Sequence, residues 1–248
     1  MKIYVNYIII LTLLFSSCSK NGTHNEETPA QSDIELMKIV QEDVLKYFWD
    51  YAHPNSKLAR ERIHENDFYF NQNIVTTGAS GFGFLNILMG IENQFITKTA
   101  GISHLETALN FLENADRFHG AWPHWMDGNS GVVIPFSTLD NGGDIVETAF
   151  LCQALICIRE YFKNGNTQEQ ELAQKADELW KGVEWNWYTN GENVLYWHWS
   201  PDNEWQMNFR IEGYNESLIA YIMAISSPTD PISARSEEHT SELQSHLN

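Results

Sequence analysis

Cysteine is scarce in this sequence, with only three among 248 residues. Two of them, Cys152 and Cys157, lie close together in one apolar stretch that predicts a helix, at a spacing that does not suit a disulfide. We expect both to be small buried hydrophobic side chains. The sequence therefore indicates neither a disulfide framework nor a cysteine metal site.

Basic residues are also few, with 15 lysines and arginines against 33 aspartates and glutamates, for a formal net charge of -18 at pH 7. Such an acidic chain is a poor candidate for binding nucleic acid or an anionic membrane surface, because like charges repel. A neutral ligand such as a sugar suits this composition better.

The N-terminal segment MKIYVNYIIILTLLFSSC lacks an apolar run long enough to cross a bilayer comfortably. Lys2, a short apolar run and two small residues before Cys18 are instead typical of a secretory signal. The ending FSSC resembles a bacterial lipobox, with Phe15 in place of the usual leucine, which predicts a lipoprotein signal peptide over residues 1–18 and lipidation of Cys18. An ordinary signal peptide is the alternative.

If Cys18 is lipidated, the protein is exported and held in the periplasm or at the outer membrane by an N-terminal lipid anchor. The polar residues 19–31 then form a flexible tether. At the other end, RSEEHTSELQSH resembles a translated sequencing adapter, so we expect residues 235–248 to be an artefactual tail, with a natural disordered tail as the alternative. On the adapter interpretation the natural protein continues beyond Ala234, and the chain is a truncated fragment with one partial domain over residues 32–234.

Helices dominate this domain, and apolar and amphipathic ones alternate. The apolar helices open near glycine and recur about every 65 to 70 residues, which is an internal period of helical hairpins. The six predicted helices cover residues 32–52, 76–93, 103–115, 144–162, 166–188 and 213–226. We therefore predict an all-α fold, the N-terminal half of an (α/α)6 toroid, with a short β-hairpin excursion in NGENVLYWHWSPD.

Tryptophans gather in loops, in GAWPHWMDG, VEWNWYTNG and YWHWSPDNEW. Tryptophan beside Pro, Gly, Asn and Asp is often the wall of a pocket, although packing within the loop is an equal alternative for any single residue. His124 and Arg210 could hydrogen-bond a ligand, with structural roles as the alternative. The candidate substrate-binding residues are Trp122, His124, Trp125, Trp197 and Arg210.

Carboxylates gather where two apolar helices begin: Asp140, Asp144 and Glu147 in TLDNGGDIVETAF, and Glu216 in the expected first turn of the last helix. Inner helices of a toroid converge with their N-termini toward one mouth, so we expect these groups to face one hollow. Glycoside hydrolysis needs such a set, because one carboxylic acid protonates the departing oxygen while a carboxylate activates water or attacks carbon. A helix cap and a calcium site are the alternatives.

Five blocks of the chain, between about residues 33 and 232, resemble the glucoamylase-like lipoproteins of Bacteroidota, including the glycoside hydrolase family 144 endo-β-1,2-glucanases. The blocks are AHPNSKLARER, TTGASGFGF, GAWPHWMDGNSG, LDNGGDIVETAFLCQALICIREYF and EGYNESLIAYIMAISSPTDPI. The resemblance implies an (α/α)6 toroid that needs no cofactor and cuts β-1,2-glucan with inversion of configuration. It places the essential acids on Asp140, Asp144, Glu147 and Glu216.

Two other functions fit parts of the pattern. A non-catalytic polysaccharide-binding lipoprotein would use the same tryptophans without needing the acids. A sugar epimerase on an α/α toroid would need converging histidines, whereas the histidines here are scattered in loops.

Overall fold

The computed structural model describes residues 29–64, 72–213 and 215–236. The chain divides into two compact units within helix α2 (Pro29–Trp49), one ending at Ile39 and the other beginning at Val40. Helix α2 begins at Pro29, before the start at residue 32 that the sequence predicts. The predicted signal peptide with Cys18, and residues 237–248 of the predicted tail, lie outside the described residues.

None of the helices in the described part of the chain combines the length and the apolar character that a membrane span requires.

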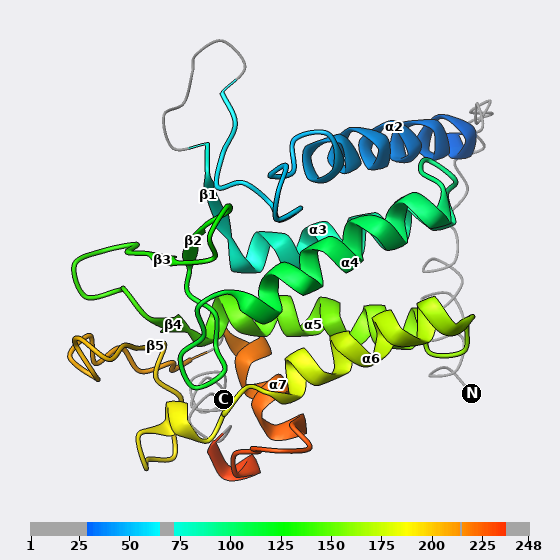
Figure 1. Ribbon diagram of the computed structural model, residues 1–248. Helices are drawn as coiled ribbons and strands as arrows, with labels where there is room; N and C mark the ends of the chain where they lie inside the picture. Colours follow the sequence, from blue (N-terminus) through cyan, green and yellow to red (C-terminus); the bar gives the residue numbers. More distant parts are fainter. Residues whose placement is uncertain (1–28, 65–71, 214, 237–248) are drawn as a thin grey trace, which may run out of the picture. The chain divides into compact units, whose positions relative to one another are not determined.

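The second unit contains two helical hairpins and a final helix. Helices α3 (Thr77–Glu92) and α4 (Lys98–Asn114) form the first hairpin, and α5 (Ile145–Phe162) and α6 (Thr167–Lys181) form the second; α7 (Leu218–Ser226) follows. Helix α5 packs against α3, α6 and α7, while α4 packs against α3 and α6 (Figure 1). The predicted alternation of inner apolar helices and outer amphipathic helices is therefore confirmed.

The contact between the inner helices α3 and α5 is unusually close. Gly81 of α3 lies against the backbone of α5, and a Cβ atom at this position would meet the Phe150 carbonyl oxygen at 2.5 Å and the Leu151 Cα at 2.8 Å. Both neighbours are backbone atoms, which a side-chain movement cannot remove. The apolar faces of α3 and α5 are buried here, with Phe84, Ile87 and Leu155 each at most 1% exposed.

Short strands lie at the end of the hairpins where α3 and α5 begin (Figure 1). Strands β1 (Ile74–Thr76), β2 (Trp125–Asp127) and β3 (Val133–Ile134) form a three-stranded antiparallel sheet in that order. Strand β4 (Gly143–Asp144) pairs with β5 (His198–Trp199). Because β1 runs directly into α3 and β4 into α5, both pairings fix where the inner helices start.

The predicted β excursion is present, but its pairing is wider than a local hairpin. The aromatic run folds back on the chain, since Trp197 N donates to the Phe209 carbonyl and Ile211 N donates to the Leu195 carbonyl. The end of the same run forms β5, whose partner β4 lies much earlier in the sequence. The three-stranded sheet was not predicted from the sequence.

Helix boundaries differ from the predictions at three places. Helix α4 begins at Lys98 rather than at Ser103, because the Thr97 side chain caps it by accepting from Ala100 N at 3.2 Å. Helix α6 ends at Lys181, and the residues after it form loops and the short 3-10 helix η1 (Trp187–Thr189). Helix α7 begins at Leu218, so Glu216 precedes the helix and does not lie in its first turn.

We expect Gly81→Ala to lower the free energy of unfolding by roughly 1–3 kcal/mol, because the added methyl group meets backbone that must move apart. Gly90→Ala is the matched control, since its Cβ would meet only side-chain atoms, the end of Leu45 at 2.9 Å and Ile96 Cγ1 at 3.4 Å. A gain in helix propensity of about 1 kcal/mol offsets that contact, so the control should stay near wild type. Urea denaturation of both variants measures the difference, and equal values would contradict the close-contact interpretation.

Candidate active site

One pocket of about 470 Å³ opens at the starts of α3, α5 and α7. Its polar wall contains carboxylates and a histidine, and its apolar wall contains aromatic rings. The lining residues include Glu61, Phe82, His124, Trp125, Phe136, Glu147, Phe150 and Glu216. Glu147 and Glu216 therefore lie in one hollow, as predicted, whereas Asp140 and Asp144, which were expected to face the same hollow, are not among its lining residues.

Asp144 is the N-cap of α5, and its side chain is completely buried. Its Oδ1 accepts from Val146 N at 3.0 Å and from Glu147 N at 2.9 Å. Its Oδ2 accepts from Trp197 Nε1 at 2.9 Å and pairs with His124 Nδ1 at 3.0 Å. Four partners occupy the lone-pair positions of the carboxylate, which is how a buried charge avoids a large desolvation penalty. Asp144 thus has the contacts of a residue that positions its neighbours.

His124 joins this buried carboxylate to the pocket. Its ring pairs with Asp144 through Nδ1, stacks on Phe136 with centroids 4.1 Å apart, and lines the pocket. Burial disfavours the charged imidazolium, but the hydrogen bond to Asp144 and the charges of Asp144, Glu147 and Asp140 outweigh it and raise the pKa of His124. The raised pKa favours the imidazolium, in which the second ring nitrogen also carries a hydrogen that it can donate to a ligand.

Glu147 lies in the first turn of α5 and reaches across to the start of α3, where its Oε2 accepts from Gly78 N at 2.8 Å. A Cβ atom on residue 78 would lie 2.5 Å from this oxygen, so glycine is what allows the approach. Burial and the charge of Asp144 raise the pKa of Glu147, and the nearby Glu216 adds to this effect. Glu147 is therefore a pocket-lining carboxyl group whose raised pKa favours the protonated form more than in a free glutamate.

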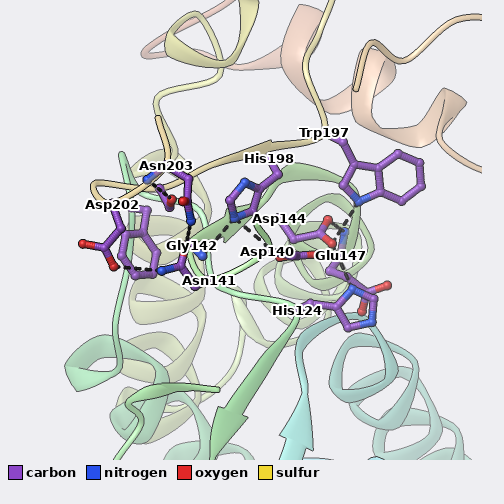
Figure 2. A network of polar contacts seen from close by, with 12 residues as sticks. His124, Asp140, Asn141, Gly142, Asp144, Glu147, Trp197, His198, Asp202 and Asn203 are labelled. Carbon is purple, nitrogen blue, oxygen red and sulfur yellow. Dashed lines mark hydrogen bonds and ion pairs between the residues drawn. The ribbon is translucent and has the colours of Figure 1, made fainter. Parts of the chain in front are cut away.

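Asp140 lies before α5 rather than on its first turn, in the loop that leads into β4. It is 5% exposed, and its Oδ1 lies 3.5 Å from His198 Nε2. Burial and the charge of Asp144 raise the pKa of Asp140 to about 6, against an opposing contribution from His124. Figure 2 shows Asp140 and Asp144 side by side, with His124 and Glu147 on one side and His198 on the other.

The remaining predicted residues divide into those at the pocket and those away from it. Trp125 and Glu216 line the pocket. Trp197 does not line the pocket, but it donates a hydrogen bond from Nε1 to the Asp144 carboxylate. Trp122 is completely buried in the core, with Nε1 donating to the Leu112 carbonyl at 3.0 Å, so the expectation of a pocket wall is wrong for this side chain.

Arg210 does not reach the pocket either. It pairs with Glu192, lies 3.8 Å from Glu212, and donates through Nε to the Tyr196 hydroxyl at 3.1 Å. These contacts hold the β excursion together, so they agree with the structural alternative for this residue.

Several residues of the site were missed from the sequence, among them the pocket residues Glu61, Phe82 and Phe150. Gly78 was recognised only as part of a helix start, Phe136 stands in a loop without a tryptophan, and His198 lies in the middle of an aromatic run. Their proximity to the carboxylates depends on pairing between distant segments. A glycine at the start of an apolar helix was the only local signal that could have indicated a close approach.

His124, Asp140 and Asp144 could each offer a metal ligand, with the candidate atoms within 4.8 Å of one another. The lone pairs of Asp144 and the Nδ1 atom of His124 are, however, already engaged in the hydrogen bonds described above. The geometry is that of a hydrogen-bonded charge cluster, and it offers a cation no open carboxylate edge on Asp144. Cys152 and Cys157 are free thiols, and burial raises the pKa of Cys152 to about 12.

Comparison with solved structures confirms the resemblance and the fold. The endo-β-1,2-glucanase of Chitinophaga pinensis, solved as a sophorotriose and glucose complex, is 52% identical with a TM-score of 0.82; the match covers 84% of this chain and 51% of that chain. A β-1,2-glucanase of Parabacteroides distasonis is 43% identical with a TM-score of 0.79, covering 84% of this chain and 30% of that one. The partial toroid predicted from the sequence is thus the fold of these enzymes over about half, or less, of their length.

A further relative is an exo-β-1,2-glucooligosaccharide sophorohydrolase (non-reducing end) of Parabacteroides distasonis, which is 44% identical over 215 residues. That match covers 85% of this chain and 29% of the relative. No protein-family profile matches the chain. Similar proteins of known activity are therefore glycoside hydrolases that act on β-1,2-linked glucose.

The raised pKa of Asp140 makes stability depend on pH. A group whose pKa is raised to about 6 in the folded state, from 3.8, contributes stability that is present below about pH 4 and is lost as the pH rises through 6. Asp140→Asn cannot ionise, so at about pH 7.5 it should exceed wild type by roughly 1–3 kcal/mol in free energy of unfolding, with no difference near pH 4.

Urea denaturation at the two pH values, followed by tryptophan fluorescence, measures this effect. Asp33→Asn, at an exposed position in α2, is the control and should follow wild type at both values. If Asp140→Asn and wild type differ by the same amount at both pH values, Asp140 does not titrate as described.

Proposed function

We propose that the protein hydrolyses β-1,2-linked glucan within the chain, with inversion of configuration, and that the pocket at the starts of α3, α5 and α7 binds the sugar. One observation carries this proposal: Glu147 and Glu216, which come from different inner helix starts, line the same aromatic pocket. A pocket with acidic groups and ring faces suits a neutral ligand with many hydroxyl groups. The activities of the similar enzymes support the choice of β-1,2-glucan.

We assign the proton donor to Glu147 and the base to Glu216. Glu147 is held against Gly78 N, and burial and the charge of Asp144 raise its pKa, so its protonated form can give a proton to the glycosidic oxygen as the bond from C1 to that oxygen breaks. Glu216 is exposed, so it can accept a proton from a water molecule that attacks C1 from the opposite face of the ring. The products are two shorter glucans, with the configuration at C1 inverted.

Asp140 and Asp144 act behind the pocket wall in this proposal. Their charges raise the pKa of His124, which favours the cationic ring, and that form can donate a hydrogen bond to a sugar hydroxyl. Trp125 and Phe136, whose rings meet edge to face with centroids 4.8 Å apart, offer ring faces for the sugar. Binding and proton transfer then use different residues of the same pocket.

The assignment predicts that Glu147→Gln and Glu216→Gln each reduce turnover of linear β-1,2-glucan by about 10²–10⁴-fold. Release of reducing ends by the full-length protein measures turnover, and NMR of the first product gives its anomeric configuration. Glu171→Gln, at an exposed position on α6, is the matched control and should retain wild-type turnover. Wild-type turnover in either pocket variant would remove that residue from the reaction. Sugar binding without any release of reducing ends would instead favour the binding-protein alternative.

We also propose that the protein is exported and anchored by a lipid on Cys18, on the strength of the FSSC motif. Metabolic labelling with an alkyne fatty acid in a bacterial host should label the wild-type protein. Cys18→Ser should lose the label and move the protein from the membrane fraction to the soluble fraction. Equal labelling of both proteins would exclude Cys18 as the lipidation site.

A further inference from the structure

The loop that carries Asp140 is held by a segment from elsewhere in the chain, residues 197–203, which we call the bracing segment. Strand pairing joins the two, with Asp144 opposite His198 and Gly143 opposite Trp199. Gly142 approaches the bracing segment so closely that a Cβ atom there would lie 2.2 Å from the Trp199 carbonyl oxygen. The acidic loop therefore cannot be placed by its own sequence alone.

His198 makes the central contact of the bracing segment. Its side chain is completely buried, its Nε2 accepts from Gly142 N at 2.9 Å, and the same atom lies 3.5 Å from Asp140 Oδ1. An Nε2 atom that accepts a hydrogen bond carries no proton, so the neutral ring has its hydrogen on Nδ1. That Nδ1 atom is buried without a partner among the described residues. An unpaired buried donor is unfavourable. The contacts of Nε2 with Gly142 N and Asp140 are therefore the favourable interactions of this ring.

A second chain of contacts holds the same loop from its outer side. Asn203 Nδ2 donates to Asn141 Oδ1 at 2.9 Å, and Asn141 Nδ2 donates to Asp202 Oδ2 at 2.8 Å. Figure 2 shows this pair of contacts beside the bond between His198 and Gly142. Asn141 and Gly142 are thus both held by the bracing segment, directly after Asp140 in the sequence.

We infer that His198 is a positioning residue for the acidic site: by accepting from Gly142 N it fixes the loop of Asp140, and Asn203 assists through Asn141. His198 does not line the pocket, so it acts only through the residues that it holds. The inference rests on the proposed function in one respect, since its effect on turnover requires the pocket to hydrolyse glucan. Its effect on the loop does not require that activity.

Replacing His198 separates positioning from binding. His198→Ala should lower kcat on β-1,2-glucan about 10–100-fold while KM changes less than about 2-fold, because the loop held by His198 leads through β4 into α5, which carries the proposed proton donor Glu147, and misplacement of a catalytic group affects turnover. His198→Gln should recover most of the loss, since its side-chain oxygen can accept from Gly142 N in place of Nε2. Asn203→Ala should lower kcat by a smaller factor of about 3. Gln206→Ala, exposed in the same excursion, is the control and should match wild type.

Hydrogen–deuterium exchange of residues 137–142 gives the readout that is independent of activity. Exchange in this loop should rise in His198→Ala, return toward wild type in His198→Gln, and stay unchanged in Gln206→Ala. Unchanged exchange in His198→Ala would overturn the inference whether or not the protein cleaves glucan. A rise in exchange with no glucan cleavage by wild type would overturn the proposed function and leave the positioning role supported. A fall in kcat that His198→Gln does not recover would also count against positioning through Gly142.

Discussion

The buried carboxylate of Asp144 is the constraint on which the rest of the site depends. A charge without solvent contact is tolerated only when donors surround it, and here two amides of α5, Trp197 and His124 supply them. These four donors come from three elements, namely the start of α5, the bracing segment and the loop before β2. Satisfying one carboxylate therefore fixes three parts of the chain relative to one another, and the pocket wall is built on that arrangement.

Glu147 and Asp140 can lie close to the Asp144 carboxylate because their raised pKa values favour their uncharged forms. Asp144 is paired with His124, while burial and the charge of Asp144 raise the pKa values of Glu147 and Asp140. Repulsion between neighbouring carboxylates, together with burial, gives the groups of this cluster different proton affinities. Acid and base chemistry requires such a difference. The raised pKa of Asp140 also lowers the free energy of unfolding near neutral pH. Asp140 therefore contributes to the site at a cost in stability.

Much of the helical part could be predicted from the sequence, because apolar periodicity and glycine-rich starts are local signals. Helix α5 begins where Asp144 predicts a cap, and α3 follows its expected range closely. The strands could not be predicted, since two or three residues are too few to show a period and β4 finds β5 far along the chain. Trp122 and Trp125 share one loop motif, yet only Trp125 reaches the pocket, because the direction of each side chain depends on tertiary packing. Glu216 was placed correctly at the pocket although its helix starts later than expected.

The long sequence interval between β4 and β5 has a consequence for the order of folding. The first hairpin, α3 with α4, contains contacts between near neighbours in sequence and can form early. The carboxylate of Asp144 cannot gain its bond from Trp197, nor Gly142 its acceptor on His198, until that later stretch of chain is present. A nascent chain that has reached only α6 therefore holds an acidic loop with unsatisfied partners. The acidic loop can therefore gain these contacts only after residues 197–203 have been added to the chain.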